Sequence, residues 1–544
     1  MESEIKEKNK EQNKRKRSMY KRLEEKYEDH LNETLPKDHH RGDIASSNRF
    51  LGYSDTVMAT CATFLVLPIR NLKKHTENQP LLDFIYSNYL QFIEFFFGFL
   101  IILTIWENLN IRAIVIKRVD DFILALVIFE MLATSILPFT LELQGHYPNE
   151  KVSVISTCVV LGILQIIDIG IILYATYSPK LLHVDLKNWT KLDLQELRLI
   201  MVFKPIVSLI LLTIAGAFSL VHYGVSWAFI TLLILMPTIR KLYWFIRRRM
   251  KKFEETEKGS FLEHFSKGSI SKERLETMSD NGVAIIACIL IVDITVDDFP
   301  QKNAVGKLGL NYNLNHMTPE FLTFLASFSL VSALWYINHS VLHLVKTVDT
   351  IMLYFQKTFL VFCCLCPLAG NMVLRFATKR NHDSVTAVRF SAMIVFISSI
   401  ANFFIYLYGL IAGSKYFYDW ASTKHFYKNK QQHLYALAKA LNLPFWSLIC
   451  ILGTLGSTYA IPYILYVTFL SALFSFFASK IVLMNHVGKA AAYIRKTIKR
   501  QAFSKETIIE CAGNNKKDFS FVSTNTSSET RYQGFYNIGN ENLN

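Results

Sequence analysis

Long apolar stretches separated by short polar segments run through most of this chain. A helix needs about 20 apolar residues to cross the hydrocarbon core of a bilayer, and these stretches have that length. We predict twelve of them, at residues 49–69, 86–108, 121–143, 151–175, 199–221, 224–244, 275–295, 319–342, 351–374, 385–412, 434–455 and 459–483. The pattern therefore predicts an all-α membrane protein with twelve transmembrane helices.

The twelve predicted spans divide into two similar halves. An arginine followed by Ser-Asp opens both the first and the seventh span, with the same spacing. The residues are Arg49, Ser54 and Asp55 in the first half, and Arg274, Ser279 and Asp280 in the second. Trp, Asp and Pro then recur 229 positions apart, as Trp106, Asp120 and Pro138, and as Trp335, Asp349 and Pro367. This order at matched spacing predicts two parallel six-helix repeats.

Basic residues divide the chain further. The net charge is +15 and the charge gathers in three segments, of which the first alone holds twelve Lys and Arg. Six spans per repeat place all three on one side, and the positive-inside rule makes that side the cytosol. We predict a cytosolic N-terminal segment (1–48), repeat one (49–244), a cytosolic basic linker (245–273), repeat two (274–488) and a largely disordered cytosolic tail (489–544). The linker is read as topology charge, with binding of anionic lipid as the alternative.

Composition narrows the function. Half of the residues are hydrophobic, and the basic segments flank membrane spans, which argues against nucleic acid as a partner. No phosphate-binding loop, zinc-protease motif or potassium-filter sequence is present, so we expect neither an enzyme nor a cofactor. Seven of the eight cysteines fall in predicted spans, and they are interpreted as buried reduced thiols rather than a metal site.

One face of the first span carries hydroxyl groups. Thr56, Thr60, Thr63 and Leu67 lie at intervals of four, three and four, which is one face of a helix. The equivalent positions of repeat two, 225 later, are Asn281, Ile285, Cys288 and Val292. The threonines either bond back to their own helix or face water and ions, and the pattern alone leaves both readings open.

Charged motif residues sit at the predicted cytosolic ends of these spans. Ionised groups near hydrocarbon need partners, so we expect a packing network with residues of the second and eighth spans. The proposed members are Arg49, Tyr53, Ser54, Asp55, Trp106, Arg274, Met278, Ser279, Asp280, Trp335, Asn338 and His339. At the other end of the seventh span, Asp293, Asp297 and Asp298 form either a cation-attracting luminal mouth or a solvated acidic loop.

The two motif helices resemble the transmembrane protein 175 family of endolysosomal cation channels, whose hallmark is R-x3-F-S-D at the start of each repeat. The stretch 271–294 is particularly similar. The resemblance implies a homodimer with a pore lined by the first helix of each repeat, conducting potassium and, at acid luminal pH, protons. It places a hydrophobic constriction at Thr60 and Ile285 and a threonine layer at Thr63 and Cys288.

The sequence departs from the family pattern at named positions. Tyr53 and Met278 replace the motif phenylalanine, and we expect both to pack. Thr60 replaces an isoleucine of the constriction and Cys288 a threonine, so selectivity and leak are the properties least fixed by the resemblance.

These observations predict a potassium and proton channel of endosomes and lysosomes, with both termini cytosolic. A secondary transporter is the first alternative, because two parallel six-span halves are also a transporter plan. The loop 107–118 lacks the charged motif usual there, and Lys204 and Lys357 are the odd charges within spans. A non-conducting membrane scaffold is the second alternative.

Overall fold

The protein is described by a computed structural model. The residues described are 44–46, 48–70, 80–183, 186, 189–250, 265, 270–292, 294–295, 299–300, 302, 305–306, 309–377, 381–422 and 430–482. The predicted luminal-mouth residues Asp293, Asp297 and Asp298 lie outside these ranges. So do residues 1–43, most of the predicted linker and the whole of the predicted tail.

Repeat one is a series of long helices with two short ones after the first. They are α2 (Asn48–Phe64), α3 (Leu67–Arg70), α4 (Leu81–Ser87), α5 (Tyr89–Val115), α6 (Asp121–His146), α7 (Lys151–Tyr177), α8 (Lys191–Phe218) and α9 (Tyr223–Met250). The lengths follow from the apolar runs, and side-chain caps at two of the helix starts, α6 and α8, help to set the boundaries.

Repeat two follows the same order. Its helices are α11 (Lys272–Val292), α13 (Leu310–His316), α14 (Thr318–Leu344), α15 (Thr350–Cys364), α16 (Cys366–Phe376), α17 (His382–Ala412) and α18 (Lys430–Gly453), before a final span, Thr458–Val482. The third span is broken between α15 and α16, where Pro367 at the start of α16 cannot donate a backbone hydrogen bond. Pro138 occupies the equivalent position inside the unbroken α6.

The predicted membrane architecture is confirmed. Among the described residues, eleven helices are long and apolar enough to cross a membrane. The remaining predicted span, the sixth (224–244), corresponds to a shorter apolar helix, Gly224–Ile239, which α9 continues to Met250. Predicted and observed spans agree to within several residues, because the apolar runs end at charged or turn-forming residues.

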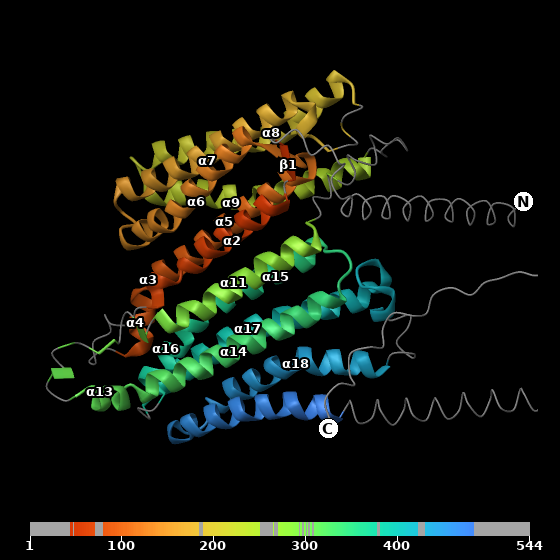
Figure 1. Cartoon of the computed structure of the whole chain (residues 1–544). Coiled ribbons are helices and arrows are strands. Elements are labelled where there is room, and N and C mark those ends of the chain that lie inside the picture. Colours follow the sequence, from red (N-terminus) through yellow and green to blue (C-terminus); the bar gives the residue numbers. More distant parts are fainter. Residues whose placement is uncertain are drawn as a thin grey trace, which may run out of the picture. The chain divides into compact units, whose positions relative to one another are not determined.

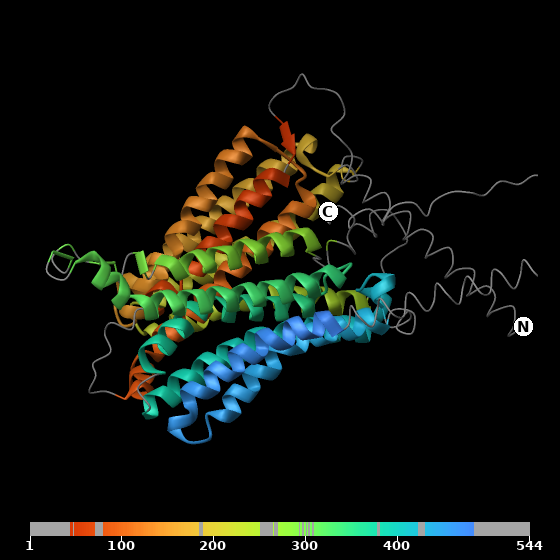
Figure 2. The same cartoon turned by 60° about the horizontal axis from the view of Figure 1, so that its bottom comes forward.

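The first helices of the two repeats pack side by side. Figure 1 shows α2 and α11 running next to each other, with α6, α7 and α8 of repeat one above them and α14, α17 and α18 of repeat two below. In Figure 2, α18 lies along α17, the pair with the most extensive contact in the chain. This arrangement brings the two motif sequences, more than 200 positions apart, into one region.

A small strand pair fixes the start of α2. Strand β1 (Ile44–Ser46) pairs antiparallel with β2 (Arg118–Asp120), which connects α5 to α6. Asp120, the last residue of β2, accepts a hydrogen bond from the Tyr174 hydroxyl at 2.7 Å. In repeat two, Asp349 accepts a hydrogen bond from the Tyr408 hydroxyl at the same distance. The duplicated aspartates thus join the start of the third span to the fourth in both repeats. No pattern in the sequence predicted the strands.

Candidate functional site

Equivalent positions of the two first helices are in direct contact. Thr56 of α2 and Asn281 of α11 are related by the repeat, and the Asn281 amide donates to the Thr56 hydroxyl at 2.9 Å. The two helices therefore lie at the same level, as adjacent walls of one structure rather than staggered neighbours. Further along each helix some side chains are exposed, such as Phe64 on α2 and Cys288 on α11. We call the exposed face of each helix its open strip.

The threonine hydroxyls of α2 bond back to their own helix. Thr56 donates to the Gly52 carbonyl at 3.0 Å, Thr60 to Thr56 at 2.8 Å and Thr63 to Thr60 at 2.9 Å. A hydroxyl has one proton but two lone pairs, so each of these oxygens can still accept a bond or contact a cation. The structure therefore shows the threonines bonded to their own helix. Their oxygens still have lone pairs that can face water or ions.

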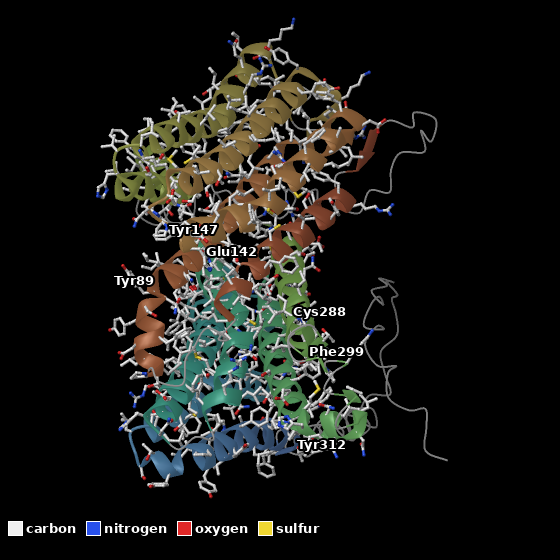
Figure 3. The ribbon with its side chains drawn as sticks, turned by 90° about the vertical axis from the view of Figure 1, so that its left-hand side faces the viewer. Tyr89, Glu142, Tyr147, Cys288, Phe299 and Tyr312 are labelled. Atoms are coloured by element: carbon white, nitrogen blue, oxygen red, sulfur yellow. The ribbon has the colours of Figure 1, made fainter. Side chains whose placement is uncertain are left out.

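The predicted pore-lining side chains differ in exposure. Thr56 and Cys288 are exposed, and Thr60, Leu67, Asn281, Ile285 and Val292 are half-buried. Thr63 is buried in the single chain, with 1% exposure, because that flank of α2 faces neighbouring helices. Cys288 lies on the open side of α11 (Figure 3). The exposed surface of each helix therefore includes a predicted pore-lining position, but the two positions are not equivalent: Thr56 is exposed on α2 and Cys288 on α11.

The motif aspartate of repeat one is enclosed by two donors. Trp106 of α5 donates its indole N–H to Asp55 Oδ1 at 2.8 Å. Arg274 of α11 donates to both carboxylate oxygens, at 2.5 and 3.2 Å. Asp55 is buried, so these charge-assisted bonds replace its hydration. The motif of repeat one is thereby bonded to the motif of repeat two.

The motif aspartate of repeat two has only half of this arrangement. Trp335 donates to Asp280 Oδ1 at 2.8 Å, as its counterpart does, and its ring stacks on His339 with centroids 5.5 Å apart. Within the described residues Arg49, the equivalent of Arg274, is exposed and makes no ion pair. Trp335 is 38% exposed, whereas Trp106 is 1% exposed.

The motif serines also differ between repeats. Ser279 donates to Asn338 at 2.9 Å, within a buried amide network that includes Gln356 of α15 and Asn402 of α17. Ser54 is buried, but its hydroxyl has no partner among the described residues. Met278 packs in the core as expected, whereas Tyr53 is 55% exposed in the single chain, so the expected packing of Tyr53 is not met there.

A buried ion pair joins the two networks. Lys357 of α15 lies 2.7 Å from Glu107 of α5, and both side chains are at most 11% exposed. Glu107 follows Trp106, and Lys357 follows Gln356, which donates to Ser279 at 2.9 Å. The contacts form a closed ring through α11, α2, α5 and α15, which we call the inter-repeat ring. It fixes the spacing of α2 and α11 through both repeats.

Some buried charges were not identified from the sequence. Arg112 of α5 binds Glu130 of α6 at 2.6 Å and Asp168 of α7 at 2.6 Å, entirely within repeat one. Each of these charges lies inside an apolar span, and that position in the sequence could have identified them. The Lys204 ammonium donates to Asn108, so the two lysines singled out within spans, Lys204 and Lys357, are both paired rather than gathered in a substrate site.

An open groove runs along α2, and Thr56, which contacts Asn281 of α11, is one of its lining residues. Its walls are α2, the start of α5 and the second half of α6, and its volume is about 460 Å³. Tyr53, Thr60 and Phe64 line it from α2, and Phe139 and Glu142 from α6. The equivalent space in repeat two holds only about 20 Å³. There α2 lies along α11 and α3 contacts α16.

Comparison with known proteins gives consistent matches. The sequence model described as endosomal/lysosomal potassium channel TMEM175 matches residues 49–138 and 274–367, once in each repeat. The chain is 28% identical to the endosomal/lysosomal proton channel TMEM175 of Gallus gallus over 377 residues, 67% of this chain and 74% of that protein. For the Mus musculus protein the identity is 28% over 425 residues, 75% and 81% of the two chains.

A shorter bacterial protein matches as well. A potassium channel of Chamaesiphon minutus is 31% identical over 103 residues, which are 19% of this chain and 49% of that protein.

Proposed function

The chain belongs to the TMEM175 family, and from this premise we propose that it is a cation channel of endosomal and lysosomal membranes, with a pore lined by α2 and α11. Potassium is the proposed main ion, with protons conducted at acid luminal pH. The observation that carries this proposal is the pairing of α2 and α11 at equivalent positions, through Thr56 and Asn281. Two walls at one level are half of a four-walled pore.

The chemistry of the open strip favours cations. The Thr56 and Thr60 hydroxyl protons are already donated to backbone carbonyls, so the oxygens present lone pairs. Oxygen lone pairs can replace water around a potassium ion, whereas an anion would need donors. At the proposed constriction, α2 contributes the polar Thr60 and α11 contributes the apolar Ile285. Alternating polar and apolar walls hydrate more readily than four isoleucines, so the closed state is expected to leak more.

We propose that the functional unit is a homodimer, in which α2 and α11 of two subunits surround one axis. Two features of the single chain support it. Arg274 reaches Asp55 within the chain, whereas the equivalent pair, Arg49 and Asp280, is incomplete. In a symmetric ring, Arg49 of a second subunit would bind Asp280 and cover Trp335.

The groove beside α2 is the second support for the dimer. In repeat two the equivalent groove is covered by α2 and α3 of repeat one, and Phe92 and Phe96 of α5 add ring contacts to Phe390 and Phe362 at 6.0 and 5.6 Å. The equivalents of Phe92 and Phe96 on α14 are the exposed Phe321 and Leu325. A second subunit would therefore bring α11 and α14 onto the open groove.

A charge exchange tests the dimer. Arg49→Asp and Asp280→Arg should each lower the fraction of dimer measured by light scattering in detergent. The double variant should restore it, because the exchanged pair can form again between subunits. Dimers unaffected by either single change, or a double variant worse than both, would exclude this contact.

We further propose that both termini are cytosolic and that the basic linker contacts anionic lipid. The support is the gathering of positive charge before residue 49, at residues 240–252 and after the last span. Accessibility of a protease site added at either end of the chain, in intact endolysosomes, tests the orientation.

Patch clamp of whole endolysosomes tests the channel itself. Under opposed potassium and sodium gradients we expect a current that reverses near the potassium equilibrium potential, with a proton component at acid luminal pH. Stoichiometric exchange of one ion for another would indicate the transporter. Absence of current from protein shown to reach the membrane would indicate the scaffold.

A further inference from the structure

The inner end of the groove beside α2 holds a buried carboxyl group. Glu94 of α5 is 5% exposed and lines the groove. Its Oε1 atom has no hydrogen-bond partner among the described residues. A buried carboxylate is costly when ionised unless a counterion or a hydrogen-bond donor compensates for its lost hydration.

The packing around Glu94 is specific. Its Oε2 atom lies against the backbone of Gly145 on α6, so closely that a Cβ at Gly145 would lie 1.3 Å from it. Any other residue at this position would displace the carboxyl group. The glycine therefore makes the room in which this side chain sits.

The groups that face Glu94 across the groove do not neutralise it. From α6 they are Glu142, which has the same charge, and His146, whose ring lies 3.2 Å from the Glu142 carbonyl. From α2 they are the Tyr53 hydroxyl and the Cys61 thiol. Figure 3 shows Glu142 near the end of α6, beside Tyr147. Among the residues that the structure describes, no lysine or arginine lines the groove.

Repeat two carries a related feature. Glu320 of α14 lies one helical turn before the equivalent of Glu94 and lines the small equivalent pocket beside α11. Its Oε2 atom is also buried without a hydrogen-bond partner among the described residues. Both repeats thus place an unpartnered carboxyl oxygen behind the end of a first helix that is remote from the motif.

We propose that Glu94 is a proton-binding site that couples luminal acidity to the position of α2. Protonation forms one O–H bond on the carboxylate and leaves the groove without a buried charge. The neutral group then fits the apolar wall of α2, and its repulsion by Glu142 disappears. On ionisation the carboxylate must draw water into the buried inner end of the groove, which moves the wall that carries Thr60 and Phe64. This proposal deepens the channel function and rests on it.

Luminal pH titration of the current tests the coupling. Glu94→Gln keeps the shape of the protonated acid but cannot titrate, so the luminal pH midpoint should shift by at least about one pH unit, or the acid response should be lost. The potassium-to-sodium permeability ratio should stay the same. Gly145→Ala, which displaces the carboxyl group, should have the same effect. His146→Gln removes the other titratable ring of the groove, and a midpoint that moves only in this variant would assign the acid response to His146. His316→Gln, at an exposed histidine of α13 that is not among the lining residues, is the control and should leave the midpoint unchanged.

A chemical measurement tests the site without any current. Dicyclohexylcarbodiimide modifies protonated carboxyl groups in apolar surroundings, and peptide mass spectrometry identifies the residue. In the purified full-length protein, labelling of Glu94 should rise as the pH falls, and Gly145→Ala should lower it. This readout also decides the case if Glu94→Gln fails to fold.

The outcomes separate the two proposals. A normal pH response in Glu94→Gln, a shift in His146→Gln alone, or labelling of Glu94 independent of pH would overturn the proton site. Absence of any current from the unaltered protein would instead count against the channel function, while the labelling result would still report on Glu94.

Discussion

Replacing Lys357 by methionine isolates the ion pair that joins the two repeats. The ammonium lies 2.7 Å from Glu107 Oε1, and the Glu107 side chain is 3% exposed. Methionine keeps most of the volume but leaves the carboxylate without its cation. Breaking a buried pair by removing one partner costs about 3 to 5 kcal/mol. We expect a loss near the lower end, because neutralisation of Glu107 by a proton limits the penalty.

The decisive variant replaces both charges. A buried pair exchanged for apolar residues of similar volume is often neutral in stability, so Glu107→Leu with Lys357→Met should recover at least about 2 kcal/mol of the loss. Thermal melting in detergent, followed by size-exclusion chromatography, measures both variants. Lys439→Met is the matched control. Within the part of the chain that the structure describes, its ammonium meets only the Tyr336 hydroxyl, at 3.0 Å, and tyrosine rings, so we expect a loss of about 1 kcal/mol.

Additive losses in the double variant would refute the reasoning, because the two side chains would then act independently. The reversal potential of the current should be recorded for the same variants. If the inter-repeat ring sets the spacing of α2 and α11, Lys357→Met changes ion selectivity and the Lys439 control does not.

Three further predictions have defined outcomes. Ile285→Asn should raise the current several-fold at equal surface expression, because it hydrates the constriction, and Thr60→Ile should lower the resting leak; unchanged currents would argue against this constriction. Asp55→Asn should lower the melting temperature of the monomeric fraction more than Asp280→Asn, because among the described residues only Asp55 has an arginine partner; equal losses would contradict that. Gly409→Ala should destabilise the fold by about 1 to 3 kcal/mol in chemical denaturation, since its Cβ would lie 1.9 Å from a phenyl ring, and an unaffected protein would show that the ring can move.

Hydrophobic runs and repeat spacing carried most of what could be predicted. The spans follow from apolar length, and the duplicated tryptophans and motif aspartates proved to be bonded in both repeats at 2.8 Å. Matching spacing is informative because two copies of one contact preserve the same residue types at the same distances along the chain. The pore roles assigned to Thr60 and Ile285 remain predictions.

The remaining contacts depend on helix rotation, which a single sequence does not encode directly. Lys357 was visible as an odd charge, but its partner Glu107 lies 250 positions away, in the other repeat. The groups bound by Arg112 have no counterparts in repeat two, so spacing could not reveal them. Likewise, the flank on which Thr63 is buried follows from the neighbours of α2 rather than from its own periodicity.

The unequal state of the two motif aspartates has a consequence for biogenesis. Asp55 meets its arginine within one polypeptide, so this contact forms at the high effective concentration of a linked chain. In the proposed dimer, the matching contact of Asp280 forms only after two newly made subunits associate. Until then a lone subunit carries an exposed arginine without an ion pair among the described residues, and a tryptophan that is 38% exposed. Such a surface distinguishes orphan subunits from assembled ones, so the rate of synthesis would govern how much protein leaves the endoplasmic reticulum.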